Sequence, residues 1–191
     1  MPLEIEIKLK VDSFEPTIEK LKSHKAEFQG DFLQADSYYD DDADSLINSD
    51  RCLRIRTHNG NGQQVIELTY KGQRQNHRFK TRREIDIKVE KAAELADIFE
   101  NLGYKKKLAF QKKRSLWRLD GCEVALDQLP LIGKFVEIEG PDDETIESVQ
   151  KKLCLEHLNH IPSSYAHQIE DELKKRNSTA KEVTFNSEPK K

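Results

Sequence analysis

The sequence predicts an α+β fold in which an eight-stranded antiparallel β-barrel forms a tunnel with a charged lumen and helices packed outside. The first observation is the segment 3–11, where the odd positions are aliphatic and the even positions are charged. A period of two is typical of a β-strand with one apolar and one ionic face. Second, later segments repeat this alternation. Third, turn-forming runs such as Asn-Gly-Asn-Gly at 59–62 separate them, as expected for hairpins.

Eight segments carry the alternating pattern or an extended, aromatic-rich sequence. They are 3–11, 28–40, 52–57, 64–71, 79–90, 104–119, 122–129 and 134–139. The short turns between several of them favour antiparallel neighbours. Strands of this length in an open sheet would leave unpaired edges, and closure into a barrel removes those edges.

Four segments have helical spacing: 14–25, 91–102, about 142–156 and about 163–175. Pro16 falls in the first turn of the first segment, and Gly103 follows the second as a C′ glycine. The expected capping residues are Asp12 or Ser13, Asp142 or Asp143, and Ser163 or Ser164. The helices must pack on the apolar face of the sheet, because their own apolar stripes have no other partner.

The chain has 191 residues, which suits one domain at 1–175. Residues 176–191 are polar and end in lysines, and they predict a disordered tail. The three cysteines have no metal-type spacing and are expected to be free thiols. The six histidines are expected mostly at the surface.

Charged residues make up 35% of the chain, yet the formal net charge is only −3. This balance argues against a broadly basic nucleic-acid-binding protein. No apolar run reaches the length needed to span a bilayer, and no signal peptide is recognised. We therefore expect a cytoplasmic protein with no nucleic-acid or membrane partner.

If the ionic strand faces line the lumen, their charged side chains can form a binding site. Basic residues recur on these faces: Lys8, Arg54, Arg56, Lys71, Lys80, Arg82, Lys112 and Arg114. Guanidinium groups match phosphate oxygens in pairs, and lysines supply point charge, so a highly anionic ligand is expected. No glycine-rich phosphate loop is present, so side chains must bind the phosphates.

Acidic residues share the same faces at Glu4, Glu6, Glu137 and Glu139. Carboxylate oxygens are the ligands of hard divalent cations, and Mg²⁺ commonly combines one or two carboxylates with substrate phosphates. The mixture predicts a complex of a divalent cation with a polyphosphate as the ligand. No Ser-His-Asp or Cys-His arrangement is suggested.

These segments resemble the CYTH family, the triphosphate tunnel metalloenzymes. The family's N-terminal Glu-x-Glu-x-Lys strand is matched by Glu4, Glu6 and Lys8. Further matching motifs follow in order at 34–40, 53–56, 68–72, 80–86, 112–114, 125–127 and 131–139. The resemblance covers about residues 2–170. Within the family, the chain looks most like the class IV adenylyl cyclase branch. It matches that branch's Leu-Gly-x-Phe-Val-Glu-Ile-Glu pattern with Ile132 in place of the usual leucine, and its Ser-Tyr pair near the C-terminus with Ser164-Tyr165.

The resemblance implies an eight-stranded tunnel that acts on triphosphates with Mg²⁺ or Mn²⁺. It implies that the eight basic residues bind the triphosphate, and that Glu4, Glu6, Lys8 and Arg56 are catalytic. The implied metal ligands are Glu4, Glu6, Asp127, Glu137 and Glu139. Tyr38 and Tyr165 are candidates for contact with a nucleoside or with a C-terminal lid.

Three functions stay open at this point. The first is a class IV-type adenylyl cyclase that converts ATP to cyclic AMP and pyrophosphate. The second is a triphosphatase acting on inorganic triphosphate (tripolyphosphate), thiamine triphosphate or a nucleoside triphosphate. The third is a non-catalytic polyphosphate or nucleotide sensor, which would need no metal carboxylates. A homodimer is a further expectation.

Overall fold

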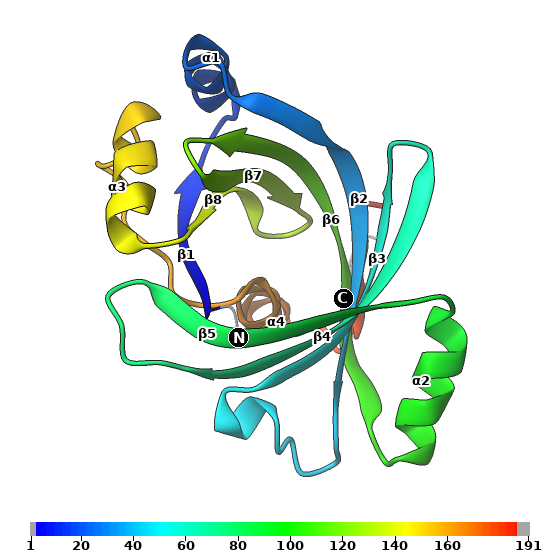
Figure 1. The fold of residues 1–191 in the computed structure, drawn as a ribbon. Helices are drawn as coiled ribbons and strands as arrows, with labels where there is room; N and C mark the ends of the chain where they lie inside the picture. Colours follow the sequence, from blue (N-terminus) through cyan, green and yellow to red (C-terminus); the bar gives the residue numbers. More distant parts are fainter. Residues whose placement is uncertain (1–2, 187–191) are drawn as a thin grey trace.

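The structure is a computed structural model that describes residues 3–186. Eight antiparallel strands close into a barrel, as the sequence predicts (Figure 1). They are β1 (Leu3–Val11), β2 (Glu27–Asp40), β3 (Cys52–Gly60), β4 (Gln63–Arg74), β5 (Lys80–Val89), β6 (Lys105–Leu119), β7 (Cys122–Leu129) and β8 (Gly133–Gly140). Their order around the barrel is β2-β3-β4-β5-β1-β8-β7-β6, and pairing of β6 with β2 closes the ring.

Four α-helices and one short 3₁₀ helix accompany the strands. They are α1 (Glu15–Ser23), η1 (Ile47–Ser49), α2 (Ala92–Asn101), α3 (Asp143–Lys152) and α4 (Tyr165–Lys175). Two predicted caps are confirmed: the side chains of Asp142 and Ser164 accept hydrogen bonds from backbone N–H groups of α3 and α4. No helix within residues 3–186 is long and apolar enough to cross a membrane.

Some predicted boundaries differ. Helix α1 begins after Phe14, which makes no side-chain cap, while Ser13 Oγ accepts a hydrogen bond from the N–H of Glu15. Helix α3 ends at Lys152 rather than near 156. Strand β4 continues to Arg74, with an irregular register after residue 71, so part of the predicted loop 72–77 belongs to the sheet.

Most of the apolar core lies between the outer face of the barrel and helices α1, α2 and α3, and a separate cluster packs α4 against Leu108, Phe110 and Phe135 on the lumen side of their strands. Helices α1 and α3 cover β1, β8 and β7, where Leu21, Ile146 and Val149 pack with strand residues such as Ile7. Helix α2 covers the opposite side and buries Phe99 (Figure 1). Each large aliphatic side chain buried in this way contributes about 1.5–3 kcal/mol, so the apolar faces stay outside and the ionic faces turn inward.

The C-terminal part differs most from expectation. Residues 176–186 are not a free tail: strand β9 (Glu182–Val183) pairs in parallel with β6, and Ala109 N–H donates to the carbonyl of Lys181 at 2.7 Å. Strand β7 pairs with β6 only from Lys113 onward, which leaves the first half of that β6 edge open for β9. The polar composition hid Val183, which is only 2% exposed and packs in an apolar cluster with Leu108. The predicted tail residues 187–191 lie outside the described residues.

Candidate active site in the tunnel

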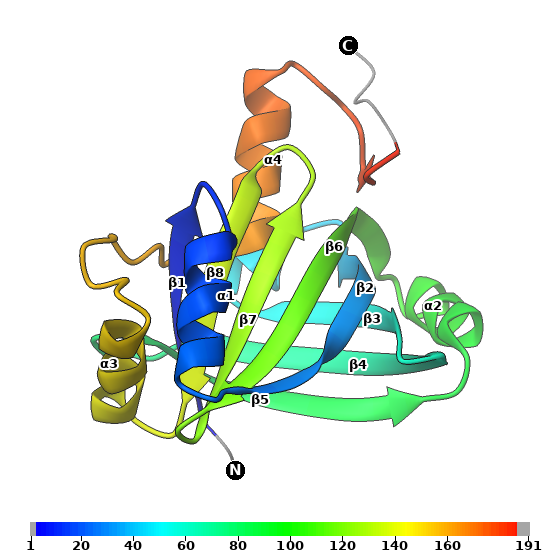
Figure 2. The same ribbon diagram turned by 90° about the horizontal axis from the view of Figure 1, so that it is seen from above.

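A cavity of about 1060 Å³ lies inside the barrel, and residues of α4 such as Tyr165 and Leu173 form part of its wall. Figure 2 shows α4 standing at one end of the barrel. The cavity wall includes the predicted site residues Glu4, Glu6, Lys8, Tyr38, Arg54, Arg56, Lys71, Lys80, Arg82, Lys112, Arg114, Glu137, Glu139 and Tyr165. The structure therefore brings together side chains from seven strands and α4. Asp127 alone among the predicted residues is absent from this wall.

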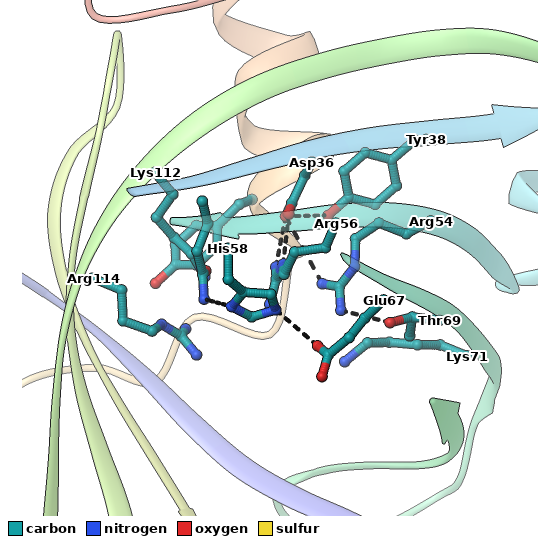
Figure 3. A network of polar contacts seen from close by, with 12 residues as sticks. Asp36, Tyr38, Arg54, Arg56, His58, Glu67, Thr69, Lys71, Lys112 and Arg114 are labelled. Atoms are coloured by element: carbon teal, nitrogen blue, oxygen red, sulfur yellow. Dashed lines mark hydrogen bonds and ion pairs between the residues drawn. The ribbon is translucent and has the colours of Figure 1, made fainter. Parts of the chain in front are cut away.

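Strands β2, β3 and β4 form a wall of paired charges (Figure 3). Arg56 donates two hydrogen bonds to the carboxylate of Asp36, from Nε at 2.5 Å and from Nη2 at 2.6 Å. Arg54 Nη2 donates to Thr69 at 2.9 Å, and Thr69 donates to Asp86. Burial opposes ionisation of Asp36, yet the charges of Arg56 and Arg54 dominate and lower its pKa well below the usual range. This wall holds the guanidinium groups in fixed positions.

A second cluster lies on β6, β7 and β8 around Asp127, which is fully buried. Its carboxylate accepts hydrogen bonds from Arg114 at 2.7 and 2.6 Å and from the Tyr165 hydroxyl at 3.1 Å, and it lies 3.2 Å from Lys112 Nζ. Both oxygens therefore accept hydrogen bonds from protein groups, an arrangement that suits a supporting residue. The role of Asp127 as a metal ligand stays a prediction from the sequence.

The lysines near α4 lie close to the aromatic ring of Tyr165. Lys8 Nζ is 4.2 Å from the ring centroid and donates a hydrogen bond to the carbonyl of Ser163, and Lys112 Nζ is 5.3 Å from the same centroid. Burial, reinforced by the Arg114 charge, lowers the pKa of Lys112 to about 7. Burial also lowers the pKa of Lys8, against the opposing charge of Glu137. An anion placed here would raise both pKa values and so favour the charged form of each lysine.

The acidic residues gather around β1. Glu6 faces Glu139 across the β1–β8 pair, and Glu4 lies close enough to act on Glu139 as well. Lys71 lies 2.9 Å from Glu4, and Lys80 forms an ion pair with Glu6. Partial burial and the charges of Glu4 and Glu6 raise the pKa of Glu139, although this residue is exposed at the mouth of the tunnel. Carboxylates crowded in this way are stabilised by a cation.

These carboxylates can be tested as a divalent-cation site. Within residues 3–186, no three His, Cys, Asp or Glu side chains are grouped closely enough to form a complete protein site. The donors nevertheless fit a cation that takes one or two carboxylates and completes its shell with phosphate oxygens and water, as Mg²⁺ does. Glu4 and Glu6 are the best placed, because each is held only by a lysine that a phosphate could also engage.

Sequence reasoning missed a polar network farther along the same wall. His58 Nε2 lies 2.7 Å from Glu67, and Gln34 Nε2 lies 3.0 Å from His58 Nδ1 (Figure 3). The prediction of a surface position was wrong for His58, which is half-buried between these partners. Its position two residues after Arg56 on the same strand placed it on the ionic face, a signal that the pattern did contain.

Two of the tunnel arginines keep donors without acceptors. Among the described residues, the buried Nε atoms of Arg54 and Arg82 have no hydrogen-bond partner. A buried donor left without a partner costs about 1–3 kcal/mol. Such donors in a basic cavity indicate that an anionic ligand completes the site.

Comparison with known proteins decides the family. The sequence model of the CYTH domain family matches residues 2–165 of this chain. The chain belongs to the CYTH family. A curated relative from Methanocaldococcus jannaschii, named "Putative adenylate cyclase", is 32% identical over 172 residues, which are 85% of this chain and 96% of that protein.

Solved CYTH-like structures agree with the barrel. The PH1819 protein of Pyrococcus horikoshii superposes with a TM-score of 0.77 at 28% identity, covering 88% of this chain and 98% of the other. The Hippeastrum protein HpAC1, reported with a dominant triphosphatase activity, superposes with a TM-score of 0.67 at 14% identity, covering 90% and 96%. The match to HpAC1 shows a shared fold. CYTH members of this kind are adenylyl cyclase-like proteins or triphosphatases, and their tunnels are generally divalent-metal dependent.

Proposed function

We propose that this chain is a metal-dependent enzyme that binds a triphosphate in the tunnel and converts ATP to cyclic AMP and pyrophosphate. The observation that carries the proposal is the ring of eight cationic side chains around one cavity, in which buried donors of Arg54 and Arg82 lack acceptors among the described residues. The curated relative's name supports the cyclase reaction.

In this reaction the 3′-hydroxyl oxygen of ATP attacks the α-phosphorus and loses its proton to solvent, the bond between the α-phosphorus and the α,β-bridging oxygen breaks, and pyrophosphate leaves with the electron pair of that bond. The ring of eight basic residues binds the phosphates. Within it, Lys8 and Arg56 stabilise the charge that develops on the phosphoryl oxygens and the leaving group. Asp36 and Asp127 position Arg56 and Arg114, since each holds a guanidinium group by two hydrogen bonds.

Glu4 and Glu6 would hold the divalent cation, with Glu137 and Glu139 as further candidate donors. A bound Mg²⁺ or Mn²⁺ supplies Lewis-acid polarisation of phosphoryl oxygens. Glu137 is the less available of the two further donors, because Arg114 lies 2.5 Å from its carboxylate. Burial opposes ionisation of Glu137, but Arg114 and Lys8 outweigh it and lower its pKa, so it remains an anion in the tunnel.

Hydrolysis is the alternative reaction, and the activity reported for HpAC1 favours it. Water would then attack the terminal phosphorus, the bond from that phosphorus to the bridging oxygen would break, and the diphosphate part would leave with the electron pair, while the terminal phosphoryl group and the water form orthophosphate. The same basic ring serves both reactions, and the placement of the nucleophile decides between them. Inorganic triphosphate, thiamine triphosphate and nucleoside triphosphates are the candidate substrates. The sensor function is disfavoured, because it needs no carboxylates and Glu4 and Glu6 line the cavity.

Product analysis separates these reactions. The purified protein is incubated with ATP, and separately with tripolyphosphate, in the presence of Mg²⁺ or Mn²⁺. Cyclic AMP and pyrophosphate from ATP are the expected products. Orthophosphate release without cyclic AMP would replace the cyclase by the hydrolase, and binding without any product would leave the sensor. A cytoplasmic location and a homodimer remain predictions from the sequence.

A further inference from the structure

The cavity extends beyond the basic ring into a space that we name the outer chamber. It is lined by Leu46, Ile47, Leu108, Leu173, Thr179 and Ala180. Polar and charged side chains share this part of the wall, among them Asp44, Lys107, Glu170 and Lys174. The whole cavity, at about 1060 Å³, slightly exceeds the range of about 300–1,000 Å³ typical of organic-ligand pockets. An inorganic triphosphate would leave much of it empty.

One wall of the outer chamber is preformed. Asp40, buried at the end of β2, accepts hydrogen bonds from the N–H groups of Leu46 and Ile47 at 3.0 and 2.9 Å. Lys107 and Asp44 pair across the opening at 2.8 Å. These contacts hold the turn around η1 in place, so this wall exists before a ligand arrives.

Another part of the wall comes from Ser178, Thr179 and Ala180, which lie after the part of the chain matched by the family model. Ser178 N–H donates to the carbonyl of Leu173 at 2.9 Å, and β9 pairs with β6. Val183 anchors the segment in the apolar cluster beneath α4. Thr179 and Ala180 therefore lie between two fixed points, the hydrogen bond of Ser178 to Leu173 and the pairing of β9 with β6.

We propose that residues 177–186 form a specificity wall, which holds the nucleoside part of a nucleoside triphosphate in the outer chamber. This inference rests on the proposed function, which places the phosphates on the basic ring. A chamber next to a polyphosphate site that offers both apolar side chains, such as Leu46 and Leu173, and polar ones, such as Asp44 and Lys174, fits a flat base and a hydroxylated sugar. The wall would give the tunnel a preference for ATP over inorganic triphosphate through contacts that only the nucleoside can make.

Binding in EDTA tests the wall without metal-dependent turnover. Calorimetry measures the affinities of ATP and of tripolyphosphate for the full-length protein. Thr179→Trp places a large ring in the chamber at an exposed position, and Val183→Asp releases the wall from its apolar anchor. Lys181→Trp is the matched control, because Lys181 is exposed on the same segment and does not line the cavity.

The expected result is a loss of ATP affinity of about tenfold or more in Thr179→Trp and in Val183→Asp, with tripolyphosphate affinity unchanged and the control like wild type. Equal weakening of both ligands, or an unchanged ATP affinity in Thr179→Trp, would overturn the proposed wall. Wild-type protein that binds tripolyphosphate but not ATP would overturn the wall while leaving a triphosphate tunnel. Binding of neither ligand, in EDTA or after addition of Mg²⁺, would remove the proposed function itself.

Discussion

Asp127→Asn tests whether this buried acid is structural or a metal ligand. The carboxylate is fully buried, and it compensates Lys112, whose side chain is 2% exposed, and Arg114, whose side chain is 18% exposed. Removing one partner of a buried ionic network costs about 3–5 kcal/mol, and asparagine keeps one oxygen acceptor, so the lower end applies. For a domain of this size, about 3 kcal/mol corresponds to a fall in Tm of about 6–12 °C.

Thermal unfolding followed by circular dichroism in EDTA measures this effect. The matched control is Glu123→Gln, because the pair of Glu123 with Arg118 is 3.2 Å long but exposed, and exposed pairs contribute about 0–1 kcal/mol. A metal ligand would not stabilise the metal-free protein. Asp127→Asn protein that unfolds at or above the wild-type temperature in EDTA would therefore refute the structural role and restore the metal role.

Three further predictions concern ligand binding. Glu6→Gln should abolish metal-dependent turnover while the circular dichroism spectrum stays unchanged, and wild-type activity in this variant would exclude Glu6 as a metal ligand. Arg82→Ala should weaken tripolyphosphate binding about tenfold or more, which calorimetry measures. Thermal melts should show little loss of stability, because among the described residues the only ion-pair partner of Arg82 is the partly exposed Asp50. Binding of tripolyphosphate should take up protons above pH 7, because burial holds the pKa of free Lys112 near 7 and a bound anion raises it. Calorimetry in two buffers of different ionisation enthalpy measures this uptake, which should fall in Lys112→Met.

The period-two pattern made most of the barrel predictable. In β1 the register follows the alternation residue by residue, with Ile7 and Leu9 buried outside and Glu6 and Lys8 in the lumen. The eight segments expected as strands are the eight strands of the barrel, because alternation fixes which face of each strand is apolar. The basic ring followed from the same argument.

The pairing of charges inside the tunnel was not predictable in the same way. Alternation places Asp127 and Glu137 on inward faces alike, but only the three-dimensional register puts Arg114 against both. Likewise, no local sequence pattern predicts that Asp40 accepts the hydrogen bonds that hold the η1 turn in place. The wall built by 177–186 was missed because its apolar anchor, Val183, is a single residue in a polar stretch.

The pairing pattern explains how one tunnel can be stable without a ligand and still accommodate the proposed metal–triphosphate complex. Without ligand, Lys80 neutralises Glu6 and Lys71 neutralises Glu4, so neither sign of charge is left buried alone. A triphosphate competes for the two lysines, and a divalent cation competes for the two glutamates. Either ligand alone would strip a partner from a buried charge, whereas both together replace each broken ion pair by another. The geometry therefore favours joint binding of cation and triphosphate over binding of either one alone.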